Sequence, residues 1–214
     1  MTNLRELSLF SNNSLMLEGA LVIAPFLPKF SKLRLLSINA NYISPDGGQD
    51  VLTTISGQSG LTYINFANNQ IEATAVFSLV VAIKTLSKLP TLLLEKNTFE
   101  AAGKTALCKE ISSLDNLTEL GLEYNHLGHE DAFAVAVVLP SLTKFMNLDV
   151  SDNKIGDAGA KALSNAVKQN GNLTRLGLNF NLIVSGLRSN NFWAHFQNCP
   201  FKFKSLVKII LIIK

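Results

Sequence analysis

Four neighbouring residues form a cluster of side chains that could bind a metal ion. His126, His129, Glu130 and Asp131 lie close together along the chain, and imidazole and carboxylate groups are ligands that zinc takes in proteins. No further set of metal ligands accompanies them. We therefore interpret the two histidines as solvated loop residues and predict no metal site.

Two other stretches resemble ligand-binding loops in part. Gly103-Lys104-Thr105 ends like a phosphate-binding loop, but Thr98 stands where that loop needs its first glycine. The run from Asp149 to Asn153 is similar to the start of a calcium loop, yet the closing glutamate is absent. No Ser/His/Asp or Cys/His set argues for nucleophilic catalysis. We predict that the protein is not an enzyme and uses no cofactor.

A repeated pattern must position all of these residues. Leu-x-x-Leu-x-Leu-x-x-Asn begins at Leu4, and the same pattern returns at nearly constant intervals. A fixed period of about 28 residues is the signature of a solenoid. The seven repeats start near residues 4, 33, 61, 89, 117, 145 and 173, and each has asparagine at the same offset: Asn12, Asn41, Asn69, Asn97, Asn125, Asn153 and Asn181.

Each repeat predicts a strand, a turn and a helix. Leu120 and Leu122 are two positions apart, as on the buried side of a short strand. The following asparagine has an amide that can satisfy backbone groups in the turn. Leu163, Ala166 and Val167 then have helical spacing. One unit cannot bury its own apolar face, so stacked units supply the core. Helices are wider than strands, so the stack should curve with its parallel sheet inside.

The repeat resembles the ribonuclease-inhibitor-like subfamily of leucine-rich repeats, a type also found in Ran GTPase-activating protein and in NOD-like receptors. The resemblance covers Leu4 to Ile183 and rests on LxxLxLxxNxI followed by a helix led by a small residue. It implies an α/β horseshoe with the parallel sheet on the concave face and the helices on the convex face. Asp131 departs from the pattern, and we interpret it as a local adjustment of a helix start. The small residues occur at Gly47, Ala75, Gly103 and Gly159.

The domain prediction is a repeat domain over residues 1–183. For residues 184–214 two interpretations stay open: a degenerate C-terminal cap or a tail unrelated to the repeats. Its apolar end is shorter than the about 20 residues that span a bilayer, so we expect no transmembrane segment. Because Met1 lies close to the first repeat, we expect either a larger multidomain chain or an open first strand.

Charge and cysteine content limit the classes of partner and the cellular compartment that we expect for this protein. Residues 158–214 contain eight Lys or Arg and no Asp or Glu, but these cations are spread out, so we expect no nucleic acid partner. The cysteines, Cys108 and Cys199, make no disulfide framework, and Cys108 is expected to be a buried thiol on a convex helix. With no signal peptide visible before the first repeat, we expect a cytoplasmic protein.

The concave face is the candidate binding surface. Residues that alternate with the buried strand positions point away from the core. In repeats four to six they include an acidic group, and apolar residues such as Phe10, Leu35, Leu93 and Phe180 also fall on this face. The predicted partner-binding residues are Tyr63, Leu93, Glu95, Glu119, Glu123, Tyr124, Asp149, Asp152, Arg175 and Phe180.

Two functional hypotheses follow. The first is a non-catalytic module that binds a protein, expected to be basic, through the acidic concave face. The second, implied by the resemblance to Ran GTPase-activating protein, is a regulator of a small GTPase. The resemblance would also imply a longer array with an acidic tail, whereas this chain has a basic end. The alternative to both is that the concave charges only keep the stack soluble.

Overall fold

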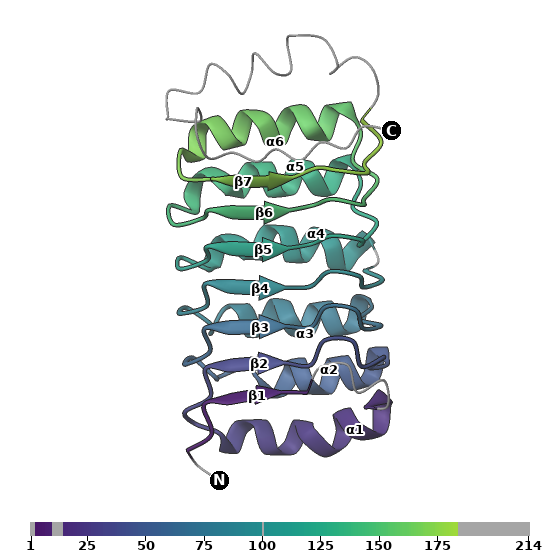
Figure 1. Ribbon diagram of the computed structural model, residues 1–214, viewed down its shortest axis with the longest axis vertical. Helices are drawn as coiled ribbons and strands as arrows, with labels where there is room; N and C mark the ends of the chain where they lie inside the picture. Colours follow the sequence, from purple (N-terminus) through teal and green to yellow (C-terminus); the bar gives the residue numbers. More distant parts are fainter. Residues whose placement is uncertain (1–2, 10–14, 100, 184–214) are drawn as a thin grey trace.

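The computed structural model describes residues 3–9, 15–99 and 101–183, which form the stack of strands and helices in Figure 1. The strands are β1 (Glu6–Ser8), β2 (Leu35–Ser37), β3 (Tyr63–Asn65), β4 (Thr91–Leu93), β5 (Glu119–Gly121), β6 (Asn147–Asp149) and β7 (Arg175–Gly177). The helices are α1 (Met16–Ile23), α2 (Pro45–Thr54), α3 (Ala73–Ile83), α4 (Ala101–Glu110), α5 (His129–Val138) and α6 (Asp157–Asn170). Short 3₁₀ helices follow three of them: η1 (Ala24–Lys29), η2 (Ile111–Ser113) and η3 (Leu139–Ser141).

Within the described ranges the strands form one parallel sheet in the order β1-β2-β3-β4-β5-β6-β7. Leu7 pairs with Leu36, and Leu36 pairs with Ile64, so each strand residue meets the equivalent position of the next repeat. Figure 1 shows the helices together on one side of this sheet. The α/β solenoid predicted from the sequence is confirmed. We call the opposite side of the sheet, which the helices leave open, the concave face.

The hydrophobic core lies between the sheet and the helices and runs along the stack. The central residue of each strand from β2 to β7 is buried: Leu36, Ile64, Leu92, Leu120, Leu148 and Leu176. Neighbouring helices approach closely where small residues were predicted to allow it. A Cβ atom added to Gly47 would lie 2.8 Å from Cβ of Ala20, and one added to Gly159 would lie 2.9 Å from Cβ of Ala132. Larger side chains there would push the repeats apart.

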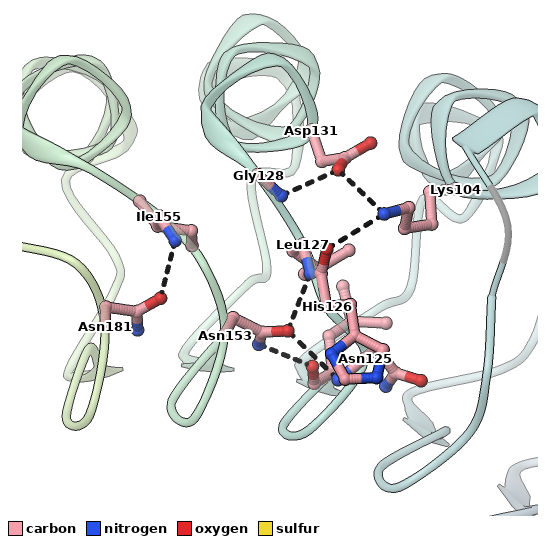
Figure 2. Close-up of polar contacts among 10 residues, drawn as sticks. Lys104, Asn125, His126, Leu127, Gly128, Asp131, Asn153, Ile155 and Asn181 are labelled. Carbon is pink, nitrogen blue, oxygen red and sulfur yellow. Dashed lines mark hydrogen bonds and ion pairs between the residues drawn. The ribbon is translucent and has the colours of Figure 1, made fainter.

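The repeated asparagines connect each repeat to the next, as Figure 2 shows for Asn153 and Asn181. The side-chain oxygen of Asn153 accepts hydrogen bonds from the backbone N–H groups of Asn125, at 3.0 Å, and Leu127, at 2.8 Å. Its amide nitrogen donates to the carbonyl oxygen of Leu122 in the preceding repeat, at 2.9 Å. Each asparagine thereby satisfies backbone groups that the short strands leave unpaired. The predicted role of the asparagines is confirmed from Asn41 to Asn181, whereas Asn12 lies outside the described residues.

Asp131, which replaces the small residue at the start of α5, has a structural role. Its Oδ2 atom accepts a hydrogen bond of 2.8 Å from the backbone N–H of Gly128 and lies 3.5 Å from Nζ of Lys104. Lys104 also donates to the carbonyl oxygen of His126, at 2.9 Å (Figure 2). The lysine of the loop-like Gly-Lys-Thr run is therefore held by protein groups. The predicted local adjustment of the helix start is confirmed.

Cys108 on α4 is buried, as predicted. Burial, with a smaller contribution from the charge of Asp131, raises the pKa of its thiol to about 12. A thiol with this pKa stays protonated near neutral pH and is a poor nucleophile. Cys108 is therefore a core residue.

Several predictions concern residues 184–214, which lie outside the described residues. These predictions are the C-terminal cap or tail and the properties of Cys199. Where the structure does describe the chain, none of its helices combines the length and the apolar character that a membrane span requires.

Candidate protein-binding surface

The sheet register places the predicted binding residues of repeats four to seven in rows across the concave face. One row follows the pairing of Thr91 with Glu119, of Glu119 with Asn147, and of Asn147 with Arg175. The next row contains Leu93, Gly121, Asp149 and Gly177. Backbone hydrogen bonds continue beyond the strands, where Lys96 N–H donates to the Glu123 carbonyl at 2.8 Å. The rows therefore bring together acidic side chains from different repeats that are distant in sequence.

We call this group of carboxylates the acidic strip: Glu95, Glu119, Glu123, Asp149 and Asp152. All five side chains are partly buried. Four of them line a hollow of about 150 Å³ on the concave face, and Asp152 lies outside its lining. The other residues around this hollow are Leu93, Leu120, Gly121, Asn147, Leu148 and Arg175.

Two glycines make room for carboxylates of the strip. A Cβ atom added to Gly121 would overlap Oε1 of Glu95, and one added to Gly177 would overlap Oδ1 of Asp149. Each carboxylate therefore folds over a glycine of the next strand along the sheet. The sequence prediction placed Gly121 and Gly177 on this face but gave them no role. The sequence feature that could have predicted this packing is a glycine on the concave face that follows an acidic concave-face residue of the preceding repeat.

Among the described carboxylates of the strip, Glu95 is the one with a buried oxygen atom that lacks a partner. Its Oε2 atom is buried and has no hydrogen-bond partner among the described residues. Burial raises the pKa of Glu95 above its ordinary value, and the negative charges of Glu123, Asp149 and Glu119 raise it further. A backbone hydrogen bond opposes this shift only in part. The strip therefore holds a carboxylate whose charge lacks a compensating partner.

Glu123 and Asp149 have different surroundings. Partial burial raises the pKa of Glu123, as do the charges of Asp149 and Asp152, while Lys96 and Arg175 lower it. Arg175 lies 3.4 Å from Oδ2 of Asp149, and its side chain is more than half exposed. The sequence prediction treated Arg175 as a partner-binding residue. In the structure Arg175, on β7, already forms an ion pair with Asp149 of the acidic strip.

Aromatic side chains lie beside the strip. Tyr124 and Phe180 are about half exposed and have left-handed backbone conformations, with φ of 56° and 53°. Lys96 Nζ is 5.4 Å from the centre of the Tyr124 ring. A hydrogen bond to Asp152, together with its charge, raises the pKa of the Tyr124 hydroxyl. Tyr63 is partly buried on β3, next to β4, and so lies at the edge of the acidic group.

The apolar residues predicted to be exposed on this face are only partly so. Phe180 is exposed, but Leu35 and Leu93 are partly buried, and Phe10 lies outside the described residues. The alternation pattern correctly placed both leucines on the concave face. It did not account for the neighbouring strands, which are about 4.8 Å away and whose side chains reduce the exposure of each leucine. The exposed apolar surface here is therefore mainly aromatic.

The raised pKa of Glu95 predicts a pH dependence of stability. In the native state Glu95 holds its proton more tightly than in the unfolded chain. Unfolding free energy is therefore lost as pH rises from the ordinary carboxyl value through the raised native value. We expect Glu95→Gln to remove this loss. The free energy of unfolding of the variant minus that of the wild type should then increase with pH, as measured by urea unfolding between about pH 4 and pH 7. A difference that stays constant over this range would contradict the prediction.

The histidine cluster forms no metal site in the part of the chain that the structure describes. His126 and His129 are exposed, and Nε2 of His129 lies 3.2 Å from the neighbouring Glu130 Oε1. Across residues 3–9, 15–99 and 101–183, no group of three or more His, Cys, Asp or Glu side chains could hold a metal ion. Asp131 points instead to Lys104 and Gly128, as Figure 2 shows.

Comparisons with known proteins agree with this architecture. Residues 141–164 match the sequence family described as Leucine Rich repeat. The chain matches no curated protein sequence. Among solved structures, internalin C2 from Listeria monocytogenes is similar, with a TM-score of 0.52 and 22% sequence identity, over 86% of this chain and 76% of that one. An internalin F structure from the same organism has a TM-score of 0.42 and 16% identity, over 75% and 58%.

The matched segment runs from η3 through β6 into α6, so it contains one complete strand and the start of the next helix. The same unit recurs along the described chain with matching strand register and asparagine contacts. The chain is therefore a leucine-rich-repeat solenoid.

Proposed function

We propose that this protein is a non-catalytic interaction module that binds a basic protein partner through the acidic strip of its concave face. The observation that carries the proposal is the uncompensated carboxylate of Glu95, which lies among Glu119, Glu123 and Asp149 at a hollow of about 150 Å³. A lysine or arginine side chain of a partner would supply the missing positive charge. Electrostatic complementarity of this kind favours both the rate and the specificity of association.

The surroundings of the strip support a protein as the occupant. Tyr124 and Phe180 present half-exposed rings next to the carboxylates. Tyrosine is enriched among the residues that contribute most to protein interfaces, because its ring buries a large area and its hydroxyl keeps a hydrogen bond. The residues of the strip lie on or just after strands of a hydrogen-bonded sheet, so their backbone positions are fixed before binding.

Charge reversal tests this proposal. We expect Glu119→Lys together with Glu123→Lys to abolish binding of a partner that the wild-type chain captures from a lysate of the source cells. The captured protein, identified by mass spectrometry and then purified, should bind the wild type less tightly as salt is added, because exposed charges are screened. The variant should bind it at least about a hundredfold more weakly, the order of loss expected when charged interface contacts are removed.

A matched control makes the same change in net charge elsewhere. Asp50 on α2 and Asp115 before β5 are exposed and do not line the hollow of the acidic strip. Asp50→Lys together with Asp115→Lys should leave binding of the purified partner unchanged. Equal binding by the wild type and both variants would mean that the strip is only solvated surface.

The hypothesis of a small-GTPase regulator stays a prediction from resemblance. An assay of GTP hydrolysis with candidate small GTPases tests it, and no acceleration of any of them would remove it. The assignment to the ribonuclease-inhibitor-like subfamily has the same status. It is supported by the constant sequence offset between paired strands from β2 to β7. The expectation of a cytoplasmic location also stays a prediction.

A further inference from the structure

A second hollow, of about 380 Å³, lies at the edge of the sheet where β1, β2 and β3 begin, on the left in Figure 1. We call it the basic hollow. Its only charged lining residues are cations, and two hydroxyl side chains accompany them. The lining consists of Arg5, Ser31, Lys32, Leu33, Arg34, Gly60, Thr62 and Lys88.

Gly60, which has no side chain, is part of the lining of the basic hollow. The residue just before the first apolar position of a repeat is lysine in repeats two, four and six: Lys32, Lys88 and Lys144. Lys32 donates to the side-chain oxygen of Asn3, one repeat earlier, at 2.7 Å, and Lys144 donates in the same way to Asn116, at 2.5 Å. The equivalent position before Lys88 is Gly60, which has no side chain to accept a bond.

The ammonium group of Lys88 is consequently unpaired in the part of the chain that the structure describes. It has no ion pair and no side-chain hydrogen bond within residues 3–9, 15–99 and 101–183. Arg5 and Arg34 also lack ion pairs in these described ranges. Among the described residues, three cations around this hollow thus have no ion pair: Arg5, Arg34 and Lys88.

Backbone hydrogen bonds fix the main-chain positions of two of these cations, Arg5 and Arg34. The carbonyl oxygen of Arg5 accepts hydrogen bonds from the N–H groups of Arg34, at 2.7 Å, and Leu35, at 3.1 Å. The Arg34 carbonyl oxygen in turn accepts bonds from Thr62, through N–H at 2.7 Å and through Oγ1 at 3.2 Å. The backbones of Arg5, Arg34 and Thr62 are therefore fixed side by side, just before β1, β2 and β3, and the long side chains must order when a ligand binds.

We propose that the basic hollow binds a small soluble anion that carries phosphate groups. The planar guanidinium groups of Arg5 and Arg34 can each donate two hydrogen bonds to a phosphate, and the ammonium groups of Lys32 and Lys88 add point charges. Ser31 and Thr62 offer hydroxyl groups to the remaining oxygens. The volume falls in the range of small-molecule sites. This site is separate from the acidic strip and does not depend on the function proposed for it.

Calorimetric titration with inorganic pyrophosphate at low ionic strength tests the proposal. We expect saturable binding by the wild type. Lys88→Gln should weaken it about tenfold or more, the effect of losing one charge-assisted hydrogen bond. Lys144→Gln is the matched control, because Lys144 occupies the equivalent position two repeats away and does not line the hollow. It removes the same charge and should leave binding unchanged.

Gly60→Asn gives the sharpest comparison, because it changes no charge. The introduced side chain would occupy the hollow and offer Lys88 the acceptor that Asn3 and Asn116 offer Lys32 and Lys144. The backbone at Gly60 is not left-handed. A Cβ atom there would lie 3.3 Å from the carbonyl oxygen of Leu33, so the substitution requires a shift of a few tenths of an ångström. Pyrophosphate binding should fall about tenfold or more, while a thermal melt should show that the variant is still folded.

The outcomes separate the proposal from its alternatives. No saturable binding of pyrophosphate by the folded wild type would overturn it, as would equal binding by the wild type and Gly60→Asn. Sedimentation with phosphatidylcholine vesicles that contain phosphatidic acid, without binding of pyrophosphate, would assign the site to a lipid headgroup and also overturn the soluble ligand. Equal losses in Lys88→Gln and Lys144→Gln would show nonspecific attraction to net charge and overturn the site.

Discussion

Replacing Leu120 by alanine is expected to lower the free energy of unfolding by about 2 to 5 kcal/mol, the cost of a large-to-small change in a packed core. Leu120 is the central residue of β5, is 1% exposed, and pairs in register with Leu92 and Leu148. The neighbouring repeats are fixed by their own backbone hydrogen bonds, so they cannot easily move in to fill the space. Urea unfolding followed by circular dichroism measures the loss.

Charge reversal on the same strand provides the control. Glu119 is adjacent to Leu120 but lies on the concave face, and Glu123 follows shortly after it on that face. Glu119→Lys with Glu123→Lys should leave the chain folded and change the free energy of unfolding by less than about 1 kcal/mol, as surface substitutions usually do. An unfolded double variant, or a Leu120→Ala protein as stable as the wild type, would show that the assignment of faces is wrong.

Replacing Asn125 by alanine is expected to lower the free energy of unfolding by about 2 to 4 kcal/mol, because it leaves buried backbone groups unsatisfied. Asn125 is fully buried. Its side-chain oxygen accepts a hydrogen bond from Asn97 N–H at 3.1 Å, and its amide nitrogen donates to the carbonyl oxygens of Leu94, at 2.8 Å, and Glu123, at 3.2 Å. Urea unfolding gives the change in stability, and hydrogen exchange at the Asn97 amide should become faster.

An exposed asparagine serves as the comparison for that variant. Asn172 donates to the carbonyl oxygen of Thr143 at 2.7 Å, but this contact is exposed, so water can replace the amide. Asn172→Ala should therefore lower the free energy of unfolding by less than about 1 kcal/mol. Equal losses in the two variants would mean that burial of the asparagine row does not determine its contribution.

The structural role of individual repeat positions could be predicted because each position recurs in the same environment. The spacing of Leu120 and Leu122 assigned them to the core, and the offset of Asn125 assigned its amide to the turn. The departure at Asp131 was correctly placed at a helix start. In these cases the chemistry is decided within one unit or by a backbone contact that every pair of units repeats.

The sequence by itself determined the solenoid, its core and the residues that face the concave side. The tertiary structure alone decided how side chains of adjacent units meet: Glu95 folds over Gly121, Arg175 pairs with Asp149, and Gly60 leaves Lys88 without a partner among the described residues. The physical reason is that periodicity fixes backbone positions, about 4.8 Å apart between strands. The conformations, burial and charges of long side chains depend on which residues lie at the same and nearby positions of the adjacent repeat.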